Sequence, residues 1–313
     1  MSLSLEQLEQ HCQTILKSRR IKNKIVVLCE GDIREIQGRL SPQSYRRMEQ
    51  MPDANFYKAC VPQGWIQYRP QFFNCGDRKD VIDSYSTLIK LHEQDSDDSY
   101  LDPNKLFAIV DLDLQIQTIE NYSFTDTEAI FCALYEKFQI KEQNTAQHRI
   151  WVTGLIHKEA YFLIPELQSL FDDLPIPPVY NDHPLNLQNV YVTMANEISS
   201  ELDLQNNLKR AFARISCCAG LDCSEIGKLR DSWKEQFQKA HDITRKDELV
   251  FALLTIKKAK NYWNQIQPIS DWTGSHKVFR EQLLLEIGRF YSEQDSNPKY
   301  HIPFLLNTLY KFA

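Results

Sequence analysis

The sequence lacks several patterns that would assign it to a familiar class. Its 313 residues contain no apolar run of membrane-spanning length, and the charged N-terminal segment has no apolar core of signal-peptide type. We therefore expect a soluble, globular, cytoplasmic protein with no membrane partner. No GxxxxGK[ST] motif or other glycine-rich phosphate loop is present. This absence excludes a P-loop ATPase and argues against a third interpretation, a nucleotide-binding regulator with a flavodoxin-like sheet.

The eight cysteines form no CxxC pair. Cys29 and Cys75 lie in apolar, strand-like surroundings, which favours buried free thiols in a reducing compartment over a disulfide framework. Cys217, Cys218 and Cys223 are close in sequence, but no nearby histidine or second pair completes four zinc ligands. The cysteines therefore do not predict a zinc site.

The composition is that of a packed protein whose charge is unevenly distributed. Hydrophobic residues make up 42% of the chain, and its length suits two domains or one domain with a large extension. The net charge is −6; residues 201–313 carry 17 Lys and Arg against 14 Asp and Glu, which leaves the first 200 residues strongly acidic. A metal-binding cluster of carboxylates produces such an excess, and so does ordinary surface composition.

The rest of the chain is organised around the segment KLFAIVDLDLQ (105–115). Its apolar run, Leu106–Val110, predicts a strand buried on both faces in the middle of a parallel sheet. Asp111 and Asp113 follow at the carboxyl end, where open α/β sheets place their ligands. Residues two apart on a strand point to the same side, so we expect both carboxylates to aim at one Mg²⁺ or Mn²⁺ ion. The alternative is that DLD only opens a turn.

Three further apolar segments are candidate strands: residues 25–29, a strand ending near Asn74, and residues 148–154. Glu30 and Gly31 follow the first, and His157 and Glu159 follow the last. If these strands are parallel neighbours, the acidic residues converge at one edge of the sheet. Strands alternating with helices predict βαβ units up to about residue 165.

Helical periodicity predicts the remaining elements. The expected helices are residues 4–20, 33–50, 78–92, 126–138, 188–203, 205–218, 224–240, 246–266, 275–292 and 302–312, with an irregular stretch at 51–70 and no strands after 184. The expected organisation is an N-terminal helix (1–22), an α/β domain (23–172), a proline-rich linker (173–186) and an all-α C-terminal domain (187–313).

The order of the motifs EG, GDRKDVI, DLD and HKEAYFL resembles a Toprim domain, the metal-binding module of topoisomerases, primases and several nucleases. The closest likeness is to the Toprim domain of OLD (overcoming-lysogenisation-defect) nucleases, over about residues 24–170. This resemblance implies a Toprim-like, mostly parallel sheet flanked by helices. It implies that Glu30, Asp111, Asp113 and Glu159 are catalytic and that Glu30, Asp111 and Asp113 hold Mg²⁺ or Mn²⁺ for phosphodiester hydrolysis.

Two positions depart from the family pattern. OLD-type domains usually carry an acid where this chain has Arg34, and often another where it has Gln115. OLD enzymes also pair the Toprim domain with an ATPase, which this sequence lacks. The resemblance therefore implies a separate ATPase or another protein as a partner, and a role in bacterial defence or nucleic-acid processing.

Basic residues supply candidate contacts to phosphate. Lys79, His157 and Lys158 lie close to the motifs, and the stretch IKKAKNYW contributes Lys257, Lys258 and Lys260 beside two aromatic residues. Each has an ordinary surface or core role as its alternative. The sequence thus predicts a metal-dependent nuclease that binds nucleic acid, with a catalytically weakened Toprim-like adaptor or sensor subunit as the alternative.

Overall fold

The centre of the protein is a four-stranded parallel sheet. The computed structural model describes residues 3–33, 52–65, 68–269, 272–294 and 297–313. The sheet has the order β2-β1-β3-β6, and each neighbouring pair is parallel. Its strands are β1 (Val26–Cys29), β2 (Gln71–Asn74), β3 (Leu106–Val110) and β6 (Ile150–Val152). The predicted α/β class, with a parallel sheet flanked by helices and a helical C-terminal region, is confirmed.

The two central strands are buried along their whole length, which explains their uninterrupted apolar sequences. Val26 of β1 pairs with Leu106 of β3, and Cys29 pairs with Ile109. This register sets the carboxyl ends of β1 and β3 side by side. The residues that follow them, Glu30 and Asp111, therefore leave the sheet at the same edge.

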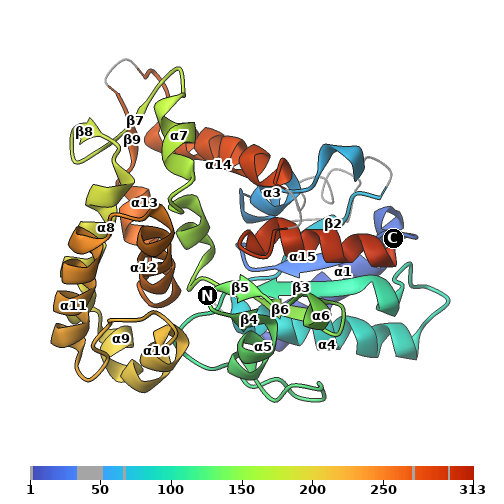
Figure 1. The fold of residues 1–313 in the computed structure, drawn as a ribbon. Helices are drawn as coiled ribbons and strands as arrows, with labels where there is room; N and C mark the ends of the chain where they lie inside the picture. The colour runs from blue at the N-terminus through green and yellow to red at the C-terminus, as the bar shows by residue number, and fades with distance from the viewer. Residues whose placement is uncertain (1–2, 34–51, 66–67, 270–271, 295–296) are drawn as a thin grey trace.

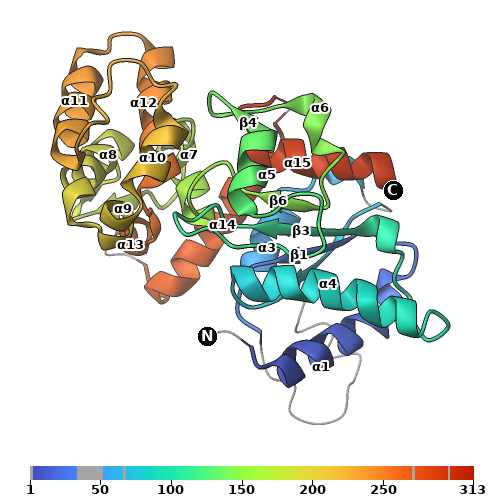
Figure 2. The same ribbon diagram turned by 90° about the horizontal axis from the view of Figure 1, so that it is seen from below.

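Helices cover both faces of the sheet (Figure 2). Those that pack on or near it are α1 (Leu5–Leu16), α3 (Pro52–Ala59), α4 (Arg78–Gln94), α5 (Thr127–Leu134) and α15 (His301–Leu309). α4 packs on β1 and β3 with α1 against it, while α3 contacts β2 and α5 contacts β6. The start of α4 is fixed by a capping box, in which Asp77 and Asp80 each accept a hydrogen bond from the other's backbone N–H.

The helical region lies beside the carboxyl ends of the strands (Figure 1). It contains α8 (Leu187–Asn196), α9 (Leu202–Asn206), α10 (Leu208–Ile215), α11 (Ile226–Lys239), α12 (Ile243–Ile256) and α13 (Lys260–Asn264). The chain then returns to the α/β layer through α14 (His276–Ser292), which packs on α3. Gly288 permits this approach, because a Cβ there would lie 2.3 Å from the Cβ of Ala59.

Short elements complete the described chain. They are η1 (Arg19–Ile21), η2 (Gln63–Trp65), η3 (Pro103–Lys105), β4 (Tyr135–Glu136), β5 (Gln139–Ile140), α6 (Glu142–Thr145), η4 (Lys158–Phe162), α7 (Leu167–Asp172), β7 (Pro178–Tyr180), β8 (His183–Pro184), η5 (Ile198–Ser200), β9 (Gln267–Pro268) and η6 (Tyr310–Phe312). None of the described helices has both the length and the apolar character needed to cross a membrane.

Three expectations of secondary structure were wrong. The helix expected over 126–138 ends at Leu134 and is followed by the β4–β5 hairpin, whose turn residues Lys137 and Phe138 have positive φ. Helix α3 and η2 occupy part of the stretch expected to be irregular. Strands also occur where none were expected.

Those unexpected strands, β7, β8 and β9, form a small antiparallel sheet that joins the proposed linker to residues near 267. Each of them contains a proline, a residue that disfavours a strand prediction. Elsewhere helices lie where they were expected, but two are divided: the helix expected over 188–203 consists of α8, η5 and the start of α9, and the helix expected over 246–266 consists of α12 and α13. The helix expected over 33–50 lies outside the described residues.

Candidate functional site

The carboxyl edge of the sheet brings Glu30 and Asp111 together. Oε1 of Glu30 accepts a hydrogen bond of 2.7 Å from the backbone N–H of Asp111. Gly31, the next residue, forms a bridge with Gly76 through two backbone hydrogen bonds of 2.9 Å. Gly76 has φ +85°, and a Cβ there would lie 2.4 Å from Oδ2 of Asp80. The turn after β2 therefore needs glycine to hold the loop that carries Glu30.

Asp111 also meets the segment that follows β6. Oδ1 of Asp111 accepts a 3.1 Å hydrogen bond from the backbone N–H of Lys158, and Oδ2 lies 3.7 Å from Nδ1 of His157. Donor atoms of Asp111, His157 and Glu159 all lie within 4.8 Å of one another, a spacing that a metal ion can bridge. Both carboxylates are 7% exposed. In the described part of the chain this is the one such group of three ligands.

Asp113 does not share that arrangement, and the expectation based on strand alternation was wrong. β3 ends at Val110, and Asp113 has φ 31°, so the DLD residues form a turn in which the rule for strands does not hold. Oδ1 of Asp113 accepts a 2.6 Å hydrogen bond from the N–H of Leu114 and lies 3.9 Å from Nζ of Lys258. Its carboxylate belongs to a neighbouring ion pair.

Burial and neighbouring charges shift the pKa values of Glu30, His157 and Asp113. Burial, and then the negative charge of Asp111, raise the pKa of Glu30 to about 8, although Arg78 and Lys158 partly oppose this. Burial also lowers the pKa of His157, against the pull of Asp113 and Glu159. At Asp113, burial acts to raise the pKa, but positive charges led by Lys258 outweigh it and the pKa is lowered.

The helical region holds the DLD turn from the other side. Nη2 of Arg214, on α10, donates a 2.8 Å hydrogen bond to the backbone oxygen of Asp113 and is also paired with Glu128. Arg210 donates to the backbone oxygen of Leu114. Lys258, next to α12, joins the Asp113 carboxylate to Asp203 of α9. The loop that carries the site thus has partners more than ninety residues away in sequence.

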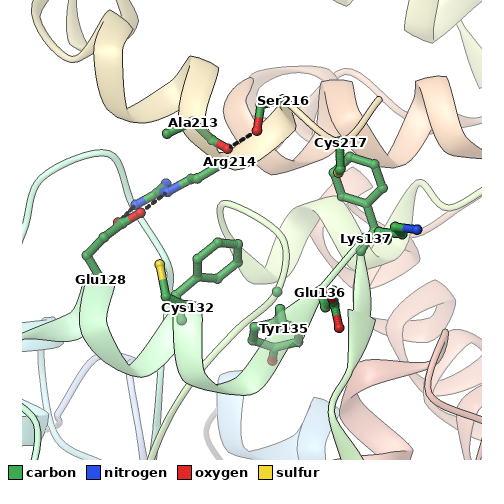
Figure 3. A pocket seen from close by; sticks show the side chains of 12 residues that line it. Glu128, Cys132, Tyr135, Glu136, Lys137, Ala213, Arg214, Ser216 and Cys217 are labelled. Carbon is green, nitrogen blue, oxygen red and sulfur yellow. Dashed lines mark hydrogen bonds and ion pairs between the residues drawn. The ribbon is translucent and has the colours of Figure 1, made fainter. Parts of the chain in front are cut away.

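Beside this turn lies a pocket of about 240 Å³ (Figure 3). It lies between α5 with the β4–β5 hairpin and the C-terminal end of α10, and the Glu128–Arg214 pair forms part of its wall. Cys132 and Cys217 also line it. The pocket therefore adjoins Arg214, which holds the backbone of Asp113, but it is not lined by Glu30, Asp111, Asp113 or Glu159.

Comparison of the chain with protein-family models, with curated proteins and with solved structures finds no match. The Toprim interpretation therefore depends on the motifs and on the geometry of the site.

Several predicted phosphate contacts lie elsewhere. Lys257 is 7% exposed, forms a 2.7 Å ion pair with Glu201 and packs over the ring of Tyr262, so we withdraw it as a nucleic-acid contact. Lys79 is exposed and pairs with Asp83 at 2.7 Å. The two aromatic residues of the stretch IKKAKNYW, Tyr262 and Trp263, are buried, so they cannot stack on a base.

Three of the other predicted phosphate contacts lie at or near the site. Lys158 and Lys258 lie at the site, and the charge of exposed Lys260 contributes to the lowered pKa of His157. Gln115 is exposed, while Arg34 lies outside the described residues.

Sequence reasoning missed Arg78 and Thr153. Nη1 of Arg78 donates a 3.4 Å hydrogen bond to the backbone oxygen of Leu112, and its charge acts on Glu30 and Asp113. Oγ1 of Thr153 accepts a 3.0 Å hydrogen bond from the N–H of Leu112. Thr153 is the first residue after β6, and Arg78 is the first residue of α4, the helix that follows β2; sequence alone could have marked both positions.

Proposed function

We propose that this chain is a metal-dependent phosphodiesterase of the Toprim nuclease type that acts on nucleic acid in bacterial defence or nucleic-acid processing. The observation that carries the proposal is the convergence of Asp111, His157 and Glu159 at the carboxyl edge of the parallel sheet, with Glu30 hydrogen-bonded to Asp111. Carboxylates gathered at this edge are where an α/β fold places a catalytic centre.

The donor set fits a divalent cation. Two buried carboxylates and an imidazole offer oxygen and nitrogen ligands within a span of 4.8 Å, and Nε2 of His157 is buried without a hydrogen-bond partner among the described residues. Oxygen ligands suit Mg²⁺, and an added imidazole favours Mn²⁺. Asp111, His157 and Glu159 would hold the ion, with Glu30 next to them. This set replaces the predicted one, because Asp113 pairs with Lys258.

Each side chain of the site has its own role in the proposed hydrolysis. A divalent cation, when bound, supplies positive charge beside the phosphoryl oxygens and lowers the pKa of water. Burial and the charge of Asp111 raise the pKa of Glu30 to about 8, which suits it to the role of a general acid. In that role Glu30 would carry its proton on Oε2, because Oε1 accepts the hydrogen bond from Asp111, and would pass it to the leaving oxygen. Lys158 and Lys258 place positive charge where a phosphate would enter.

One observation favours the adaptor interpretation instead. The carboxylate of Asp113 faces Lys258, which is also bound to Asp203, so one of the acids that the resemblance assigns to metal is already neutralised. A site weakened in this way suits a Toprim-like subunit that binds a partner, such as a separate ATPase, without cutting. Metal binding and cleavage must therefore be measured separately.

The test uses Asp111→Asn, which removes a charge and keeps the shape of the side chain. Plasmid DNA, single-stranded DNA and RNA are incubated with the protein and Mg²⁺ or Mn²⁺. We expect cleavage by the wild type and a loss of more than about 100-fold in the variant. Asp231→Asn, an exposed acid on α11, is the matched control and should cleave normally.

Calorimetric titration with Mn²⁺ separates the two interpretations. Mn²⁺ binding that Asp111→Asn abolishes, together with no cleavage of any nucleic acid, would support the adaptor. A folded wild-type protein that binds no Mn²⁺ would refute the metal site itself.

A further inference from the structure

Basic residues precede all four parallel strands, at the edge of the sheet away from the carboxylates. Lys105 and Arg149 stand directly before β3 and β6, and Lys24 and Arg69 stand two residues before β1 and β2. Because the strands are parallel neighbours, these four positions share one edge. We call this edge the basic pole and define it as residues 17–24, 68–69, 105, 149 and 310–311. Figure 1 shows the loop after α1 on the same side of the sheet as the C-terminus, away from α8–α12.

The segment KSRRIKNK (17–24) concentrates the charge of this pole. It holds five basic residues and no acid, within a part of the chain that is acidic overall. Lys17 and Lys22 are exposed. In the part of the chain that the structure describes, no ion pair engages Lys17, Lys22, Lys105 or Lys311. Their charges are therefore available to an anionic partner.

The acids nearest in sequence to this pole lie in the loop 95–102. The loop is fixed to the end of α1 and to η1, because Tyr100 donates its backbone N–H to Leu16 and its hydroxyl accepts a 3.3 Å hydrogen bond from Nε of Arg19. Asp102 caps η3 by accepting a hydrogen bond from the N–H of Asn104. These acids reduce the charge of the pole but leave it positive, because it has nine basic residues against the four aspartates of that loop.

Aromatic rings lie among the bases. Tyr310 is 52% exposed and Tyr68 is 41% exposed. Their centroids are 5.6 Å apart with an edge-to-face angle of 83°, and Tyr310 also lies 5.2 Å from Trp65. The guanidinium of Arg149 lies 4.4 Å from the ring centroid of Phe312. Half-exposed rings beside lysines form a surface that can stack bases while the lysines bind phosphates.

We propose that the basic pole binds single-stranded nucleic acid. An anionic membrane surface would also be attracted by the lysines, but the pairing of half-exposed tyrosines with separate cations favours a strand with accessible bases. The proposal stands whether or not the carboxylate site cleaves. If it does cleave, Lys105 and Asp111 are about 20 Å apart along β3, so a substrate must extend at least that far beyond the cut to reach the pole.

The test measures binding without cleavage. Fluorescence anisotropy follows labelled single-stranded DNA and RNA of about 20 nucleotides with the Asp111→Asn protein in EDTA, from about 50 to 200 mM salt. The pole variant carries Lys17→Gln, Lys22→Gln and Lys105→Gln. A matched control carries three changes on α11: Lys228→Gln, Lys234→Gln and Lys239→Gln.

We expect the pole variant to lower the slope of log affinity against log salt by about 2, because each phosphate contact to a single strand contributes about 0.7. Tyr68→Ala should weaken binding roughly tenfold at constant salt. The control should change neither quantity.

Three results would overturn the proposal: no binding by the Asp111→Asn protein with an unaltered pole, an equal loss in the control, or lysine-dependent binding to phosphatidylserine vesicles in place of nucleic acid. A protein that binds through the pole but never cleaves would refute the nuclease and leave this inference intact.

Discussion

We expect acid to destabilise the protein through His301, a buried residue that ties α15 to the α/β layer. Nε2 of His301 lies 2.8 Å from the backbone oxygen of Phe138, and Nδ1 lies 3.0 Å from the hydroxyl of Tyr161. That hydroxyl already accepts from the N–H groups of Gly154 and Leu155, so its own hydrogen points to Nδ1. The network therefore requires a neutral ring protonated on Nε2.

Burial lowers the pKa of His301 from 6.5 to about 4, and the hydrogen bond to Phe138 only partly opposes this shift. Since the folded pKa is the lower one, the unfolded chain takes up a proton first as the pH falls. The contribution of His301 to stability is fully present above pH 6.5 and is lost between pH 6.5 and pH 4. The loss is about 2 kcal/mol at pH 5 and about 3 kcal/mol at its limit.

Urea unfolding at pH 7.5, 6 and 5 compares the wild type with His301→Gln, which keeps a donor for Phe138 but cannot titrate. At pH 7.5 the variant should be less stable by about 1–3 kcal/mol, because the Tyr161 hydroxyl loses its acceptor. This difference should shrink by about 2 kcal/mol at pH 5. The exposed His276→Gln is the control. A difference between wild type and His301→Gln that stays constant with pH would refute the reasoning.

Three further predictions concern packing and the site. Gly154→Ala would place a methyl group 2.4 Å from a ring atom of the buried histidine and should lower the melting temperature, whereas Gly227→Ala, with open space in α11, should raise it slightly. Lys257→Met leaves the Glu201 carboxylate without its partner and should cost about 3–5 kcal/mol in urea unfolding, most of which a second change, Glu201→Leu, should restore. Arg214→Met frees the DLD turn and should weaken Mn²⁺ binding roughly tenfold by calorimetry; unchanged affinity would contradict the role we give this contact.

The elements that sequence predicted well are those whose own residues determine them. β1 and β3 are buried on both faces, so their apolar runs mark them without knowledge of their neighbours. The capped, amphipathic helix α4 is marked in the same way. The strands β7 and β9 were missed because each is two or three residues long, and β9 exists only through its pairing with β7, almost ninety residues away.

The site was predictable to the extent that it follows from the topology of the sheet. Glu30 and Asp111 meet because each is the first residue after one of two paired strands. The position of Asp113 depends instead on where β3 ends, and one residue beyond a strand the alternation of side chains no longer applies. No local pattern distinguishes a DxD that continues a strand from one that turns.

The contacts of the DLD turn show that the change from α/β to helical sequence does not mark the boundary of an independent folding unit. Arg214 and Lys258 belong to the helical region, yet they hold the backbone and the carboxylate of Asp113. His301, still later in the chain, contacts Tyr161 next to the site. A fragment ending at residue 172 would lose all three contacts, so the predicted boundary marks a change of secondary structure within a site that both parts build.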